Sequence, residues 1–257
     1  MNVRSADGVS IHYSSRGSGS PALVFVHGWC CDETYWEPQV KHFAERHRVV
    51  SIDLAGHGES GTDRKNWSVN AFGEDVAAVV KELPLDRVIL VGHSMGGPVI
   101  VEAARLMPER VIGLVGVDTF QDLDRKQTRA PLDERLSRFR NSFVEASREV
   151  VKSMFVEKSD PELAARIVAD MSSSPSHVGI GAIEAMGDYD AAKAMESIQV
   201  PIRCVCSDYQ PFDTEAADQH SSSFKVTFMS GVGHFVMLED PATFNRLLEE
   251  IIEELAS

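Results

Sequence analysis

One serine lies between two glycines at a spacing that could make it a nucleophile. Residues 92–96 read G-H-S-M-G, which matches the pattern G-x-S-x-G with Ser94 at its centre. An apolar run precedes this motif, and an apolar stretch with helical character follows it. A sharp turn between a buried strand and a helix presents the serine hydroxyl at the sheet edge, and the glycines let neighbouring backbone pass closely. We therefore predict that Ser94 attacks an electrophilic carbon.

A serine hydroxyl is a weak nucleophile at neutral pH and needs a general base within hydrogen-bond reach. The chain has nine histidines, and His234 is the best placed of them. It lies in the small-residue loop G-V-G-H-F, residues 231–235, after the last expected strand. Loops that follow parallel strands meet at one edge of the sheet, so we expect His234 at the same edge as Ser94. For His57, in a glycine-rich loop, we expect a structural role or a place at the rim of the site.

The chemistry also needs backbone N–H groups where negative charge develops on the attacked carbonyl oxygen. One is expected from Met95, directly after the nucleophile. The second is expected from Trp29, in the sequence H-G-W at residues 27–29, because this segment follows the apolar run at residues 22–26. Gly28 permits the turn that points the Trp29 amide toward the site.

Segments with strand and helix character alternate along most of the chain. A hairpin is predicted at residues 3–15 from the Asp7-Gly8 turn between alternating residues. Further strands are predicted at residues 22–26, 48–53, 87–91, 111–117, 202–206 and 225–229, and helices at residues 68–83, 98–107, 214–220 and 241–255, the last with Asp240 as its N-cap. This alternation predicts an α/β fold with a mostly parallel central sheet and helices on both faces.

One long segment interrupts the alternation. Residues 119–188 contain no convincing strand, are charged and favour helix, and are too many for a simple connection. We predict that they form a helical cap over the carboxyl ends of the strands, where open α/β sheets bind ligands. The predicted core then comprises residues 1–118 and 189–257.

Composition excludes several classes of partner. The formal charge of −14 and the pI near 5.0 argue against nucleic acid and anionic membrane surfaces. No secretory signal and no membrane span are visible in the sequence. The four cysteines form two close pairs, Cys30–Cys31 and Cys204–Cys206, without CxxC or zinc-finger spacing. We therefore expect reduced thiols, no metal site, a cytoplasmic location and a small-molecule substrate, and we leave open whether the chain forms a homodimer.

Together these motifs resemble the α/β-hydrolase superfamily over nearly the whole chain. D-L-A-G-H-G-E-S at residues 53–60 is similar to the family's D-x-x-G-x-G-x-S loop, and residues 233–235 resemble its base loop. Val200-Pro201 opens the late strand as it does in many members. The resemblance implies a Ser–acid–His triad, a helical cap and no cofactor.

The acid of that triad departs from the usual family pattern. The commonest members carry it in a segment resembling G-x-x-D-P, but here the segment reads S-D-Y-Q-P and Gln210 occupies the expected position. A glutamine cannot stabilise an imidazolium as a carboxylate does. Asp118 is the first candidate, because some members, including certain lipases and haloalkane dehalogenases, take their acid from the preceding strand. Asp208, Asp213 and a water-bridged or absent acid remain open.

These residues predict a carboxylic ester hydrolase that works through an acyl-enzyme, with Ser94, His234 and Asp118 as the triad. The substrate is expected to be a small to medium, largely apolar ester. The pocket walls are expected to be apolar and to include Trp29, Trp36, Met95, Phe120 and Phe235. The same residues would also suit a C–C bond hydrolase, a lactonase, a thioesterase or a cofactor-free lyase or peroxidase. From another class, the chain could be a hydrolase-like receptor or binding module with weak catalysis.

Overall fold

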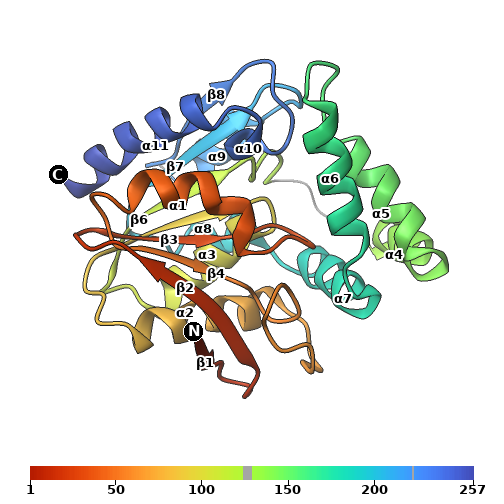
Figure 1. The fold of residues 1–257 in the computed structure, drawn as a ribbon, viewed down its shortest axis with the longest axis horizontal. Coiled ribbons are helices and arrows are strands. Elements are labelled where there is room, and N and C mark those ends of the chain that lie inside the picture. The colour runs from red at the N-terminus through yellow and green to blue at the C-terminus, as the bar shows by residue number, and fades with distance from the viewer. Residues whose placement is uncertain (124–128, 222) are drawn as a thin grey trace.

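The computed structural model describes residues 1–123, 129–221 and 223–257, and one eight-stranded sheet runs through its centre (Figure 1). The strands are β1 (Asn2–Arg4), β2 (Ser10–Arg16), β3 (Ala22–Val26), β4 (Val49–Ile52), β5 (Val88–His93), β6 (Val111–Val117), β7 (Ile202–Ser207) and β8 (Lys225–Met229). They lie in the order β1-β2-β4-β3-β5-β6-β7-β8. Strands β1, β2 and β4 pair antiparallel, and the pairs from β4 through β3 to β8 are parallel. The predicted mostly parallel sheet is confirmed.

Helices connect these strands. Before β7 they are the 3-10 helix η1 (Glu33–Trp36) and the α-helices α1 (Glu37–Phe43), α2 (Val69–Glu82), α3 (Gly96–Leu106), α4 (Arg129–Asn141), α5 (Phe143–Lys152), α6 (Pro161–Ser172), α7 (Ser176–Gly187) and α8 (Ala191–Met195). After β7 they are α9 (Thr214–His220), α10 (Val236–Glu239) and α11 (Pro241–Ala256). Helices α1 and α11 pack together on one face of the sheet, and α2 and α3 pack together on the other (Figure 1).

The central strands form because their sequences are continuously apolar. Every residue of β3, β4 and β5 is buried, as expected for parallel strands covered on both faces. Strand β8 lies at the edge of the sheet and exposes Lys225, Thr227 and Phe228. The N-terminal hairpin is also as predicted, with Gly8 at a φ of 87° in its turn.

One predicted helix boundary is wrong. Helix α3 begins at Gly96 rather than at Pro98, because the turn that carries Ser94 closes within two residues of β5. A helix tolerates proline anywhere in its first turn, because the N–H groups there have no partner within the helix. Pro98 therefore indicates the start of this helix only to within one turn. The early start places Ser94 directly before Met95, the N-cap of the helix.

The described residues between β6 and α8 form four helices and no strand. Helices α4 to α7 lie together beside the sheet (Figure 1). In the part of the chain that the structure describes, no helix is both long enough and apolar enough to cross a membrane.

Candidate active site

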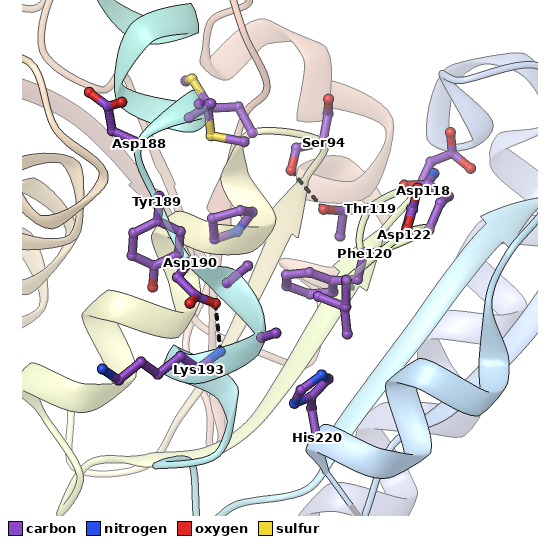
Figure 2. A pocket seen from close by; sticks show the side chains of 18 of the residues that line it. Ser94, Asp118, Thr119, Phe120, Asp122, Asp188, Tyr189, Asp190, Lys193 and His220 are labelled. Carbon is purple, nitrogen blue, oxygen red and sulfur yellow. Dashed lines mark hydrogen bonds between the residues drawn. The ribbon is translucent and has the colours of Figure 1, made fainter. Parts of the chain in front are cut away.

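Ser94 lies on a strained turn between β5 and α3. Its φ of 52° is in the left-handed region, which a residue with a Cβ rarely adopts. Two hydrogen bonds hold this conformation: the Ser94 amide donates to the Val117 carbonyl at 2.9 Å, and the Thr119 hydroxyl donates to the Ser94 carbonyl at 2.9 Å (Figure 2). A Cβ on Gly92 would lie 2.3 Å from the Gly96 carbonyl oxygen, so the turn closes only with glycine there. The structure thus contains the sharp strand–turn–helix connection that the motif predicts.

His234 lies in the loop between β8 and α10, and its ring meets Asp118. The distance from His234 Nδ1 to Asp118 Oδ2 is 2.5 Å. A carboxylate can only accept, so Nδ1 carries the proton of this hydrogen bond. In the neutral imidazole this leaves the lone pair on Nε2, as required of a base that removes a proton from a hydroxyl.

Asp118 directly follows β6 and is almost fully buried, with 1% of its surface exposed. Its Oδ1 accepts hydrogen bonds from the Ser207 amide at 2.8 Å and the Ser207 hydroxyl at 2.9 Å. Its φ is 44°, a second left-handed residue beside the site. The neighbouring strand β7 therefore holds one carboxylate oxygen while the other faces His234.

The alternative acids bind elsewhere. The Asp208 carboxylate accepts a hydrogen bond from Ser230 at 2.5 Å on the surface. Asp213 caps helix α9 by accepting from the Ala216 amide at 2.9 Å. Gln210, at the usual family position, lines the same cavity as Ser94 and His234. Of the three aspartates weighed from the sequence, Asp118 is the one that the structure brings to His234.

The H-G-W turn at residues 27–29 touches the nucleophile. A Cβ on Gly28 would lie 3.2 Å from the Ser94 Cβ and 2.9 Å from His93 Nδ1, so only glycine fits this approach. The Trp29 indole N–H donates to the Gly179 carbonyl in α7 at 2.9 Å. Met95 follows Ser94 at the start of α3 and is buried. Both segments predicted to supply oxyanion donors thus lie beside Ser94.

Three further histidines, His27, His57 and His93, are buried, and their burial favours the neutral form. Burial lowers the pKa of His27, lowers that of His57 to about 3, and holds that of His93 well below its usual range. His93 Nε2 lies 3.0 Å from the His234 carbonyl oxygen, so it donates its proton there. His57 bonds to the Ala55 carbonyl at 3.0 Å. It lies in the core and does not line the cavity.

A cavity of about 930 Å³ opens over Ser94, His234 and Asp118. Both apolar and polar side chains line it; in Figure 2, Thr119 lies beside Ser94, whereas Lys193 and His220 lie further from it. The apolar part of the lining includes Met95, Pro98, Phe120, Leu123 and Met186. The polar part includes Asp188, Asp190, Lys193, Glu196 and His220.

The prediction of the residues in the apolar walls is only partly correct. Phe120 and Met95 line the cavity, but Trp36, Phe235 and Trp29 do not. Trp36 is fully buried against Phe25 beneath the sheet face, and Phe235 stacks on Phe155 with ring centroids 5.3 Å apart. An aromatic side chain next to a motif can point into the core or into the cavity, and its direction depends on packing that the sequence does not show.

Several residues that support the site carry no sequence signal of their own. Thr119 fixes the Ser94 carbonyl and Ser207 fixes Asp118. Glu239 accepts a hydrogen bond from Gly233, beside His234. Thr119 and Ser207 lie far in sequence from their partners, and short polar residues beside strand ends are common everywhere. Glu239 lies six residues after Gly233, but its spacing alone does not indicate this contact. Within residues 1–123, 129–221 and 223–257, no group of three or more histidine, cysteine, aspartate or glutamate side chains is arranged to hold a metal ion.

Solved structures with the same architecture include hydrolases. A thermophilic esterase from Thermogutta terrifontis, solved with malate bound, superposes with a TM-score of 0.87 over 100% of this chain and 99% of that chain, at 21% identity. The protein Est816, described as an enzyme that degrades N-acyl homoserine lactones, superposes with a TM-score of 0.83 over 97% of this chain and 99% of that chain, at 26% identity.

Sequence comparison leads to the same family. The chain is 24% identical to 3-oxoadipate enol-lactonase 2 of Acinetobacter baylyi over 255 residues, covering 96% of this chain and 95% of that protein. A sequence model of the alpha/beta hydrolase family matches residues 23–247. That match runs from the strand before the H-G-W turn to the last helix and includes Ser94, Asp118 and His234, so the chain belongs to the alpha/beta hydrolase family.

Proposed function

We propose that this hydrolase cleaves carboxylic esters through an acyl-enzyme on Ser94. The observation that carries the proposal is the hydrogen bond between His234 and buried Asp118, at the cavity that Ser94 also lines. It supports a neutral imidazole with its free nitrogen available as a base.

In the proposed reaction His234 Nε2 takes the proton from the Ser94 hydroxyl as its oxygen attacks the ester carbonyl carbon. The Met95 and Trp29 amides stabilise the negative oxygen of the tetrahedral intermediate. The intermediate collapses, the bond to the alcohol breaks, and His234 returns the proton to the leaving alkoxide. Water then attacks the acyl-enzyme with the same assistance and releases the carboxylic acid and free Ser94.

The cavity supports a small to medium ester whose apolar part lies against Met95, Pro98 and Phe120. Asp190 and Lys193 lie at its further end, where they would contact a polar group of the substrate. We further propose that residues 119–188 form a cap over the core, because Met186 and Gly187 at the end of α7 line the cavity together with Ser94.

Lactone opening is the second candidate. Two similar proteins are described as acting on lactones, one as an enol-lactonase and one on N-acyl homoserine lactones. A lactone is a cyclic ester, so the proposed steps apply unchanged, except that the released alcohol stays attached to the acyl group.

A single substitution tests the nucleophile. Ser94→Ala removes the attacking oxygen, so hydrolysis of 4-nitrophenyl butyrate should fall by at least about 10³-fold. Labelling by a fluorophosphonate probe, which requires an activated serine, should disappear with it. Ser230→Ala is the matched control and should keep the wild-type rate, because Ser230 is exposed and its hydroxyl donates to Asp208 rather than to a residue of the proposed triad.

The proposal fails if Ser94→Ala retains full activity. A wild-type protein that neither hydrolyses esters and lactones nor reacts with the probe would instead favour the receptor or binding module.

A further inference from the structure

Hydrogen bonds from several segments fix the main chain of residues 233–235, which we call the His234 loop. The Gly233 amide donates to both carboxylate oxygens of Glu239, each at 3.0 Å, and the Phe235 amide donates to Glu239 Oε1 at 3.2 Å. Between them, the His234 amide donates to the Met154 carbonyl at 2.8 Å. The His234 carbonyl accepts from His93 at 3.0 Å. Every one of these bonds acts on the main chain that carries the proposed base.

Glu239 also reaches the turn between α5 and α6. The Ser159 hydroxyl donates to Glu239 Oε2 at 2.5 Å, and the same hydroxyl oxygen accepts from the Val156 amide at 3.0 Å. Phe155 in this turn stacks on Phe235 with an angle of 23° between the ring planes. One carboxylate therefore joins the His234 loop to a turn of the proposed cap, about 80 residues earlier in the chain.

Three hydrogen-bond donors converge on this carboxylate, and an ionised acceptor forms stronger and more directional bonds than a neutral one. The amide of a glutamine has one acceptor oxygen and one N–H₂ donor, so it cannot accept on both sides. The two oxygens of Glu239 let it accept from both segments, whereas a glutamine would turn its N–H₂ group toward one of them.

We propose that Glu239 is a positioning residue, which sets the place of the His234 ring and couples that place to the cap turn at residues 153–160. This inference rests on the proposed function, since positioning matters only if His234 acts as the base. A shift of about 1 Å in a catalytic group can lower the rate by about 10²-fold. Loss of the carboxylate should therefore act on the reaction more than on substrate binding.

The test compares Glu239→Gln with the matched control Glu250→Gln, which alters an exposed glutamate on α11. We expect Glu239→Gln to lower kcat for 4-nitrophenyl butyrate by about 10- to 100-fold while KM changes by less than about threefold. The rate of fluorophosphonate labelling should fall in parallel, because the probe reports activation of Ser94 directly. Glu250→Gln should match the wild type in all three measurements.

Ser159→Ala separates the two arms of the contact. It removes the bond from the cap turn and leaves the bonds from Gly233 and Phe235, so kcat should fall by less than in Glu239→Gln. If the Ser159 hydroxyl acts only through the Glu239 carboxylate, the variant carrying both Ser159→Ala and Glu239→Gln should be no slower than Glu239→Gln alone.

Two outcomes would overturn the inference: a Glu239→Gln variant whose kcat stays within about twofold of the wild type, or a loss fully explained by a smaller folded fraction. Failure of the proposed function is distinguishable from both. In that case the wild type itself would show no hydrolysis that depends on Ser94.

Discussion

At the scale of single residues, the place of the acid decides how the site can work. Strand β6 lies between β5, which leads to Ser94, and β7, which leads to Gln210. A carboxylate at the end of β6 can therefore approach His234 from the strand next to the nucleophile. Asp118 does so, and the Ser207 amide and hydroxyl hold its second oxygen. This chain thus has Gln210 at the usual position of the acid, after β7, and a carboxylate, Asp118, at the end of the neighbouring strand β6.

Replacing Asp118 by asparagine should keep the shape of the site and remove its charge. The amide group no longer enforces the Nδ1 proton on His234 and no longer stabilises the imidazolium, so kcat should fall by about 10²- to 10⁴-fold. Ester hydrolysis by Asp118→Asn and Asp208→Asn, measured side by side, checks this. Asp208→Asn should be nearly unchanged because Asp208 bonds to Ser230 on the surface. A normal rate in the first variant, or a large loss in the second, would contradict the assignment.

The sequence predicts the nucleophile turn and the acid to different extents. G-x-S-x-G is local, so five residues predict the position of Ser94. The pairing of Asp118 with His234 joins residues 116 positions apart, and the sequence favoured Asp118 but left Asp208 and Asp213 open. Only packing of β6 against β7 distinguishes them, and that packing is a property of the folded chain.

At the scale of elements, most strands and helices follow from local patterns. Ser68 caps α2 and Asp240 caps α11 by accepting from backbone amides three residues later, as such residues commonly do. Boundaries were harder to predict where tertiary geometry overrides propensity, as at the start of α3. Side-chain direction was harder still to predict: Trp36 and Phe235 are fully buried in the core, which their neighbours in sequence do not indicate.

The N-cap residue of α2, Ser68, offers a test of N-capping at a place away from the cavity. The Ser68 hydroxyl accepts from the Ala71 amide at 3.1 Å, so Ser68→Ala should lower the free energy of unfolding by about 1 kcal/mol. Ser68→Asp keeps an acceptor at the same place and should remain close to the wild type. Urea denaturation measures both, and kcat should stay unchanged because no residue of α2 lines the cavity. Equal stability of Ser68→Ala and the wild type would show that the cap contributes nothing.

At the scale of the whole molecule, buried polar groups join distant segments. Arg64 bonds to both oxygens of Asp75 at 3.0 and 2.6 Å and to Asp7 at 2.8 Å. Asp75 also accepts from Ser5 at 2.5 Å. The N-terminal hairpin is thereby tied to α2, with the Arg64 and Asp75 side chains fully buried. Removing one partner would leave the other charge buried and unpaired, so a single substitution at Arg64 or Asp75 should lower the free energy of unfolding.

The buried neutral histidines make the fold sensitive to acid. Burial lowers the pKa of His57 from 6.5 to about 3, so between these pH values the unfolded chain binds a proton that the folded chain does not. The free energy of unfolding should therefore decrease as the pH falls through this window, by up to about 1.4 kcal/mol per pH unit for one such group. Above pH 6.5 this dependence disappears, since both states are neutral at His57.

Thermal unfolding at pH 7, 6, 5 and 4 measures this dependence. His57→Asn removes the titrating ring and keeps an N–H donor for Ala55, so its Tm should fall less steeply with decreasing pH than that of the wild type. The exposed His177 is the control, and His177→Asn should keep the wild-type slope. Parallel slopes for all three proteins would exclude a contribution from His57.

The order of the site residues along the chain also has a consequence during synthesis. Ser94 and Asp118 leave the ribosome first, and His234 follows Asp118 by 116 residues. At about 5–20 residues per second, the nascent chain carries Ser94 and Asp118 without His234 for about 6–23 s. Strand β8 must then pair with β7 before the loop that follows it can bring His234 to Asp118. On the proposed mechanism, the nascent chain hydrolyses no ester until its C-terminal segment has folded.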